Sequence, residues 1–288
     1  MDLLENLKHR FKHAGIVEKL IYINLTVFLA VFIVNTFSFL FQSKSNFLVK
    51  WLALPADIND FLLKPWTILT YGFLHADFIH ILFNLIALFF IGHLFKQYFT
   101  SKQLLNFYLL GTLFGGIIFI ASYNFFPVFQ NDTDRSVLLG ASAGISAIFI
   151  GIATYIPNYQ LKFPLIGFIK LWILACMWVA LDIIQIPAGN AGGHLAHIGG
   201  ALLGFVYVNY ASNKEIAIFK PLTDLFKRYP KETPLKTVYK SGQKTTYSTK
   251  SKSKNQQEID AILDKISKSG YETLSKEEKE FLFKQGKN

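Results

Sequence analysis

Four polar side chains in apolar stretches of the chain are of types that can do nucleophilic chemistry. Ser142 lies in GASAGISAIF, His197 lies in GGHLAHIGGALLGF, and both His80 and Asn84 lie in LHADFIHILFNLIALF. A serine hydroxyl becomes a nucleophile when an imidazole within about 2.6–3.2 Å can take its proton. An imidazole and an amide can also donate hydrogen bonds to the oxyanion that forms when serine attacks a carbonyl. The residue types therefore favour acyl transfer, provided that the fold brings the three segments together.

Six long apolar runs hold these residues. Hydrophobic residues make up 52% of the 288-residue chain, and a helix needs about 20 mostly apolar residues to cross the hydrocarbon core of a bilayer. A buried helix of a soluble protein would explain any one of the shorter runs, but not six in succession. The predicted fold class is therefore all-α, a polytopic bundle of six transmembrane helices over residues 20–212. The runs are Leu20–Phe41, Ile79–Phe99, Leu104–Phe126, Gly140–Ile156, Ile169–Ile186 and Gly192–Tyr210.

The distribution of basic residues predicts how the bundle is oriented. Residues 1–19 and the tail after Ser212 are rich in lysine and arginine, whereas the opposite loops offset their basic residues with aspartates or carry no charge. Because basic loops stay on the cytoplasmic side, both termini are expected in the cytoplasm. Residues 1–19 are then a cytoplasmic segment without a cleavable signal, since the apolar run after them is too long for one. The net charge of +10 indicates contact with anionic lipids rather than nucleic acid, because no nucleic-acid-binding motif accompanies it.

This orientation places the reactive side chains at one depth. With both termini inside, the second, fourth and sixth spans all begin at the outer face. His80, Ser142 and His197 each lie near the start of one of these spans. Ionisable groups in hydrocarbon are costly, so each is a candidate functional residue, with helix-to-helix hydrogen bonding as the alternative explanation.

Small residues beside Ser142 and His197 are expected to let the fourth and sixth spans touch. His197 begins a helical stripe of small residues on the sixth span, and Ser142 lies between two glycines on the fourth. Spaced small residues permit close approach of helix backbones. Such an approach would let a short serine side chain reach an imidazole. The glycines are Gly140 and Gly144 on the fourth span, and Gly200 and Gly204 on the sixth.

The fourth span is predicted to be too short to cross the bilayer. If it is helical from Ser142 to Ile156, its length of about 15 residues rises only about 22 Å, against about 30 Å for the hydrocarbon core. Its outer end is therefore expected below the membrane surface, in a cavity that admits water. Ser142 at a helix N-terminus would also have free backbone N–H groups beside it, which would stabilise an oxyanion.

In three motifs the chain resembles the rhomboid intramembrane serine proteases. The first motif is two histidines and an asparagine near the second span, the second is glycine-x-serine on a short fourth span, and the third is alanine–histidine followed by spaced glycines on the sixth. The matching residues are His75, His80, Asn84, Gly140, Ser142, His197, Gly200 and Gly204. The resemblance covers residues 66–210. It implies an endopeptidase in a bacterial inner membrane that cleaves transmembrane segments of other proteins near the outer face, without cofactor or metal.

The resemblance also implies a role for each site residue. Ser142 is expected to be the nucleophile and His197 the general base. His80 and Asn84, with the backbone amide of Ser142, are expected to form the oxyanion hole. His75 is expected to be a structural hydrogen-bonder for the first loop.

Four further residues are interpreted through the resemblance. The family works as a Ser–His dyad, so Asp182 is expected at the wet mouth of a lateral gate formed partly by span five, not as a third catalytic residue. His194 is interpreted as a histidine at the membrane interface whose hydrogen bonds are satisfied. The alternative is that it adjusts the basicity of His197. Ala143 stands where the family often has glycine, which predicts altered detail in the oxyanion loop. Thr67 stands where the family often has arginine after the tryptophan, here Trp66, which puts lipid or loop contacts in doubt.

The tail after the bundle is predicted to have two parts. Residues 213–255 are rich in lysine, serine and threonine and favour a basic linker. Residues 256–288 favour a small helical hairpin, in which Gly270 ends the first helix and Ser275 with Glu278 forms a capping box for the second. Its role is open between docking of a partner and stabilisation of the protein.

Two other classes of protein remain as alternatives. One is a catalytically inactive relative that binds or escorts transmembrane helices, against which the presence of both Ser142 and His197 argues. The other is a transporter with a histidine metal site. Against it, the sequence has no acidic residue next to a histidine in the spacing of a zinc-peptidase helix, and it has no inverted repeat. The expected partners are transmembrane protein substrates and membrane lipids, and the sequence does not predict the oligomeric state.

Overall fold

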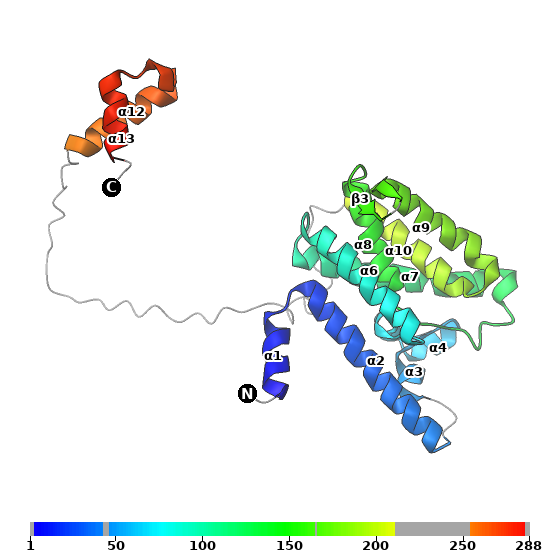
Figure 1. Cartoon of the computed structure of the whole chain (residues 1–288). Coiled ribbons are helices and arrows are strands. Elements are labelled where there is room, and N and C mark those ends of the chain that lie inside the picture. Colours follow the sequence, from blue (N-terminus) through cyan, green and yellow to red (C-terminus); the bar gives the residue numbers. More distant parts are fainter. Residues whose placement is uncertain (1–2, 43–45, 165, 211–253, 286–288) are drawn as a thin grey trace, which may run out of the picture. The chain divides into compact units, whose positions relative to one another are not determined.

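The computed structural model describes residues 3–42, 46–164, 166–210 and 254–285 (Figure 1). Six apolar helices correspond to the six predicted spans. They are α2 (Ile16–Leu40), α6 (Phe78–Lys96), α7 (Ser101–Phe125), α8 (Ser142–Tyr155), α9 (Leu171–Gln185) and α10 (Ala191–Tyr210). Five of them are long and apolar enough to cross a membrane, and α8 is a shorter apolar helix. The predicted all-α membrane bundle is confirmed, including its short fourth span.

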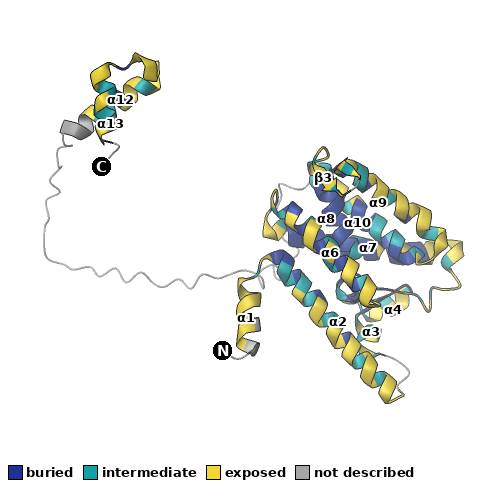
Figure 2. Cartoon of the chain, in the orientation of Figure 1, coloured by how far each residue is buried: buried dark blue, intermediate teal, exposed yellow. Residues whose placement is uncertain are grey.

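Helix α8 forms the centre of the bundle. Residues 143–153 of α8 are all buried, and the helix packs against α6, α7, α9 and α10. Figure 2 shows dark blue at α8, whereas α6 and α9 on either side of it are largely yellow. A helix that is apolar on every face needs neighbours on every face. The short helix is therefore held by protein around its whole circumference.

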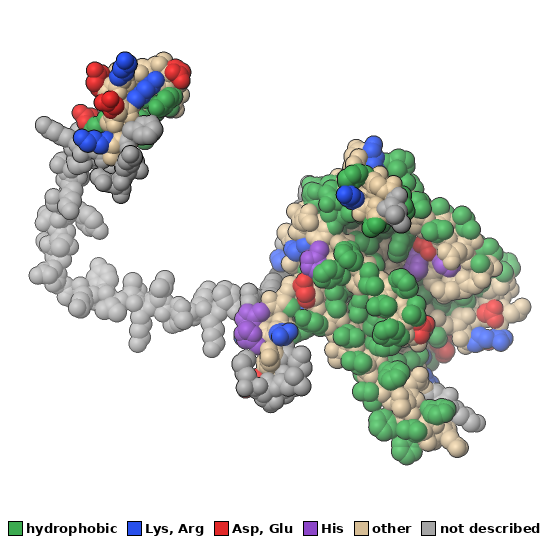
Figure 3. Space-filling view, viewed as in Figure 1, with side chains coloured by type: hydrophobic (Ala, Val, Ile, Leu, Met, Phe, Trp, Pro, Cys, Tyr) green, Lys and Arg blue, Asp and Glu red, His purple; other side chains and the backbone are tan. Residues whose placement is uncertain are grey.

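The outer helices carry apolar side chains on their exposed faces. In α2, and in the segment Leu171–Ala188 that contains α9, only 17% of the most apolar 18-residue stretch is buried. Figure 3 shows hydrophobic side chains covering much of the face that α2 and α6 present in this view. Large exposed apolar surfaces on a soluble monomer are rare, and here they are the surfaces that face lipid. Representative exposed side chains are Phe32, Phe39, Phe83, Phe90 and Ile184.

The loop between α2 and α6 is built of short elements fixed by hydrogen bonds. They are α3 (Phe47–Leu52), β1 (Leu54–Pro55), α4 (Ile58–Leu63), α5 (Thr67–Thr70) and η1 (Tyr71–Phe73). The Tyr71 hydroxyl donates to the Thr112 carbonyl on α7 at 2.6 Å, and the Thr70 hydroxyl donates to the Leu52 carbonyl at 2.7 Å. Burial, with a smaller effect from nearby Tyr108, raises the pKa of the Tyr71 phenol, so it remains a neutral donor.

Short strands complete the connections on either side of α8. Strand β1 pairs antiparallel with β2 (Val137–Leu138), which brings the first loop beside the segment that leads into α8. Between them in the chain, η2 (Pro127–Phe129) follows α7. Strands β3 (Gln160–Phe163) and β4 (Gly167–Lys170) form an antiparallel hairpin between α8 and α9. The helix η3 (Ile186–Ala188) then joins α9 to α10.

The chain divides into two compact units, Met1–Arg228 and Tyr229–Asn288. The first holds the bundle and a short N-terminal helix, α1 (Leu3–His13). The second holds α12 (Lys254–Ser269), η5 (Tyr271–Thr273) and α13 (Lys276–Gln285). The predicted basic linker, residues 213–255, lies almost entirely outside the described residues.

The ends of the two tail helices follow the predicted signals. Gly270 has φ +83°, which favours glycine, and its N–H donates to the Ile266 carbonyl at 2.9 Å. The Glu278 carboxylate accepts from the Ser275 N–H at 2.7 Å, and the Ser275 hydroxyl accepts from the Glu278 N–H at 3.3 Å. This reciprocal pair is the predicted capping box.

Close packing of α10 on α8 generates a stability prediction. A Cβ atom on Gly204 would collide with the Ala147 carbonyl of α8, which cannot move aside as a side chain can. We expect Gly204→Ala to lower the free energy of unfolding by about 1–3 kcal/mol, the usual cost of overpacking. Denaturation of the purified protein in detergent measures it. Leu202→Ala is the matched control, because Leu202 is half exposed on the same helix; equal stability of the parent and both variants would contradict the predicted collision.

Candidate functional site

Ser142 and His197 meet where α8 and α10 cross. Ser142 is the first residue of α8, and its Oγ lies 2.6 Å from Nε2 of His197. The approach depends on α10 glycines, because a Cβ on Gly200 would collide with the Ala143 carbonyl. The predicted pairing of the serine and the histidine is present in the structure. On α8 the close contact is made by Ala143 and Ala147, whereas Gly144 faces Tyr108 and Thr112 of α7.

The turn before α8 requires glycine for two reasons. Gly140 has φ +135°, a conformation that other residues rarely adopt. A Cβ on it would also lie 3.1 Å from the His80 ring and 3.3 Å from Ser142 Oγ. The Gly140 N–H donates to the Tyr71 carbonyl at 3.0 Å, which ties this turn to the first loop. Gly140 therefore leaves open the space between Ser142 and His80.

His80 and Asn84 face the same space from α6. The Asp77 carboxylate caps α6 by accepting from the His80 N–H at 2.8 Å, which sets His80 in the first helical turn. Asn84 follows one turn later, is 7% exposed, and donates one amide hydrogen to the His80 carbonyl at 2.9 Å. The Asn84 amide has a second hydrogen to offer. Both residues line the same cavity as Ser142, and their role in an oxyanion hole stays a prediction.

A cavity of about 760 Å³ surrounds these side chains. Helix α6 contributes one wall, α9 contributes another, and α8 and α10 contribute the reactive pair. Trp178 and Gln185 on α9, with Asn190 before α10, were not predicted as lining residues. The lining includes Phe83, Ser142, Trp178, Gln185, Asn190, His194 and His197.

The structure contradicts the exposed position expected for Asp182, whereas His194 is hydrogen-bonded, as the sequence predicted. Asp182 is not at an exposed gate mouth but 6% exposed, and its Oδ1 lies 2.8 Å from Nδ1 of His197. The same oxygen lies 2.8 Å from Nδ1 of His194. The signal in the sequence was a single carboxylate in an apolar span, since such a group needs polar partners in a membrane.

The same three side chains could also ligate a cation. The ligating atoms of Asp182, His194 and His197 all lie within 4.8 Å of one another. Two imidazoles and a carboxylate are suitable zinc ligands. A metal on Nδ1 of His197 would replace the hydrogen that the imidazole shares with Asp182. Chelator treatment is therefore a necessary control for any activity assigned to Ser142.

The predicted hydrogen bond from His75 to the first loop stays a prediction. His75 is 4% exposed and its ring packs edge-on against His80, with 5.1 Å between centroids. Among the described residues neither ring nitrogen has a hydrogen-bond partner, although the Phe73 backbone is near. His75 therefore supports His80 by packing.

Trp66 and the two departures from the family pattern have structural roles. Trp66 Nε1 donates to the Trp51 carbonyl at 2.8 Å and the two rings stack. The Thr67 hydroxyl donates to the Lys64 carbonyl at 2.6 Å, which stabilises the start of α5. Ala143 is buried between α7 and α10. All three hold the scaffold around the site.

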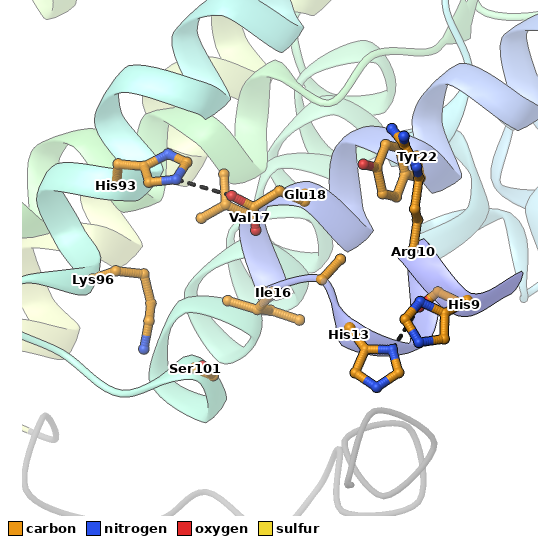
Figure 4. Close-up of a pocket in the computed structure, with 12 residues that line it drawn as sticks. His9, Arg10, His13, Ile16, Val17, Glu18, Tyr22, His93, Lys96 and Ser101 are labelled. Carbon is orange, nitrogen blue, oxygen red and sulfur yellow. Dashed lines mark hydrogen bonds and ion pairs between the residues drawn. The ribbon is translucent and has the colours of Figure 1, made fainter. Parts of the chain in front are cut away.

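A second pocket, of about 660 Å³, lies near the start of α2 and the end of α6 (Figure 4). Its histidines bond to other groups: His93 Nε2 lies 2.9 Å from Glu18, and His13 Nδ1 lies 2.7 Å from the His9 carbonyl. Ser101 also lines it, but Figure 4 draws no interaction between Ser101 and a histidine. Among the described residues that line this pocket, no serine–histidine contact like that of Ser142 and His197 is present.

A family model described as the rhomboid domain matches residues 63–214. The chain belongs to the rhomboid family. Because the chain belongs to this family and has five helices long and apolar enough to cross a membrane, it is an integral, multi-pass membrane protein. A second model, a family of unknown function (DUF6576), matches residues 247–286, which include α12 and α13.

Named relatives of the rhomboid chain come from bacteria, plants and animals. It is 28% identical to RHOMBOID-like protein 12, mitochondrial, of Arabidopsis thaliana, over 49% of this chain and 44% of the relative. It is 24% identical to Rhomboid protease GlpG of Yersinia pseudotuberculosis, over 55% of this chain and 52% of the relative. It is 34% identical to Presenilin-associated rhomboid-like protein A, mitochondrial, of Danio rerio, over 48% of this chain and 36% of the relative. The chain spans about half of the length of each of the first two relatives and a smaller share of the third.

Buried His75 generates a prediction about pH. Burial, and secondarily the neighbouring His80, lowers the pKa of His75 below its ordinary value. The unfolded chain therefore binds a proton at this residue before the folded protein does, so stability is present above about pH 6.5 and is lost as the pH falls toward the folded pKa. We expect His75→Gln to reduce the loss of stability between pH 7 and pH 5. Unfolding midpoints of parent and variant at both pH values measure this, and identical losses would contradict it.

Proposed function

We propose that this rhomboid protein is an intramembrane serine endopeptidase with Ser142 as nucleophile and His197 as general base. The observation that carries the proposal is the 2.6 Å distance between Ser142 Oγ and His197 Nε2. In the first step the hydroxyl hydrogen passes to Nε2 while Oγ bonds to the scissile carbonyl carbon. His197 then returns the proton to the leaving amine, and water cleaves the acyl-enzyme by the same sequence.

The oxyanion is proposed to form between α6 and the start of α8. His80 and Asn84 line the cavity beside Ser142, and the first backbone N–H groups of α8 have no partners within the helix. Gly140 leaves room for the oxygen, because any Cβ there would lie 3.1 Å from His80. Loss of one such donor typically costs about 3–4 kcal/mol of transition-state stabilisation.

The proposed substrates are transmembrane segments of other membrane proteins. The cavity is lined by α6 on one side and by α9 on the other, and the outer faces of these helices are apolar. A substrate helix could therefore reach Ser142 from the lipid, between α6 and α9. The catalytic residues all lie at the starts of α6, α8 and α10, so cleavage is proposed near one membrane face.

The basic residues support a proposed orientation and domain division. Both termini are proposed to lie in the cytoplasm of a bacterial inner membrane, which places Ser142 toward the outer face. Residues 1–19 and the linker 213–255 would then meet anionic lipids. Residues 20–212 would form the membrane domain and residues 256–288 a separate tail, in line with the two compact units and the two matching family models.

Substitution of the reactive pair tests the proposed function. We expect Ser142→Ala and His197→Ala each to reduce cleavage of a single-span substrate by about 10³-fold or more, because the nucleophile or its base is lost. The assay uses detergent-purified protein and gel analysis of the products. Ser101→Ala and His93→Ala, both in the pocket of Figure 4, are the matched controls and should cleave as the parent does.

Either of two results would contradict this proposal. Cleavage that persists in Ser142→Ala would assign the activity to another residue or another protein. A folded parent that cleaves no membrane-protein substrate, yet binds transmembrane segments, would indicate an inactive rhomboid-like protein instead.

A further inference from the structure

Asp182 is a buried carboxylate whose partners belong to the catalytic helix. It lies near the end of α9 and is 6% exposed. Ionised groups in an apolar setting are costly unless hydrogen bonds compensate them. Its Oδ1 is shared by two imidazoles, His194 and His197, each with Nδ1 at 2.8 Å. The only charged group that α9 buries is thus directed at α10.

The hydrogen bond from His197 to Asp182 determines which ring nitrogen of His197 carries the hydrogen. An ionised carboxylate only accepts, so the Nδ1 atom of His197 must donate. The neutral ring then has its lone pair on Nε2, the atom that lies 2.6 Å from Ser142 Oγ. This is the tautomer that can take the serine proton.

His194 fixes Asp182 from the other side. His194 and His197 are one helical turn apart, and their rings are nearly perpendicular, at 83°, with 5.8 Å between centroids. Because both donate to the same Oδ1, the carboxylate cannot rotate toward one without losing the other. His194 is therefore placed to hold the carboxylate where His197 needs it.

We propose that Asp182 is a positioning residue for His197, which makes the site a Ser142–His197–Asp182 triad in which His194 holds the carboxylate in place. The inference rests on the proposed protease function. In neither step does a proton move to Asp182: when the serine proton moves to Nε2, the carboxylate stabilises the resulting imidazolium, and when the proton leaves with the amine the neutral tautomer is restored. Asp182 orients the base and balances its charge but never bonds to the substrate.

Other titratable groups around His197 belong to α6 and its preceding loop. His80 lines the same cavity as His197, and the His75 ring packs edge-on against His80. Ser142 from α8, and Trp178 and Gln185 from α9, are polar neighbours that line the same cavity. Among the described residues near the dyad, Asp182 is the group that can supply a negative charge to Nδ1.

The kinetic test compares Asp182→Asn and Asp182→Glu with the parent in the cleavage assay. Asparagine can present a donor to Nδ1 and so favour the wrong tautomer; we expect kcat to fall by about 10²–10⁴-fold with little change in KM. Glutamate keeps the charge and should recover part of the loss. Asp60→Asn, on exposed α4, is the matched control. Unchanged kcat in Asp182→Asn would overturn the inference, as would equal losses in the asparagine and glutamate variants.

A spectroscopic test needs no folded variant of Asp182. Heteronuclear NMR of the parent, labelled at histidine and assigned with His197→Gln, should place the His197 hydrogen on Nδ1 at neutral pH. A hydrogen on Nε2 would overturn the inference. So would activity that is lost with a chelator and restored by zinc, because Asp182 would then be a metal ligand.

The two proposals fail in different ways. If Ser142→Ala cleaves as well as the parent, the protease function itself fails. If Ser142→Ala is inactive while Asp182→Asn retains the parent kcat, only the role of Asp182 fails.

Discussion

The site depends on the contact between the backbones of α8 and α10. Gly200 and Gly204 leave no side chain between the helices, and the Ala143 and Ala147 carbonyls occupy that space. Serine has one of the shortest polar side chains, so the helices must approach this closely for Ser142 Oγ to lie 2.6 Å from His197. The other helices serve this contact, because α6, α7 and α9 surround α8 and keep it against α10.

Two buried tyrosines outside the site are also hydrogen-bonded through their hydroxyls. Tyr108 donates to the Gly72 carbonyl at 2.7 Å and receives a hydrogen bond from Asn24 at 3.2 Å. Tyr71 donates to Thr112, and its own carbonyl accepts from Gly140. In an apolar medium each such pair avoids the cost of an unsatisfied group. These bonds connect α2, α7 and the first loop to the turn that carries Ser142.

Asp182 would give α9 two roles in the proposed mechanism. The helix lines the cavity through Trp178 and Gln185, and it carries the carboxylate that orients His197. The base would then have its correct tautomer only while α9 lies against α10. Substrate entry and activation of the serine would thereby depend on the position of one helix.

Much of the bundle was predictable because apolar length and spaced small residues are local signals. The six spans, the short α8 and the Ser142–His197 pair follow from them, and the ends of the tail helices follow from a glycine and a capping box. The contact of Asp182 was not predicted, because α9 is apolar on most of its surface and its pattern does not determine its rotation. The first loop was not predicted in detail either, since its order comes from hydrogen bonds such as that of Trp66 to Trp51, between residues far apart in sequence.

The central claim is that α8 and α10 make Ser142 unusually reactive. Reaction of the detergent-purified protein with a fluorophosphonate, followed by peptide mass spectrometry, measures this directly without any knowledge of the substrate. The account predicts one adduct, on the peptide that contains Ser142, and none in His197→Ala. No adduct on the folded parent, or an adduct at Ser142 that persists undiminished without His197, would contradict it.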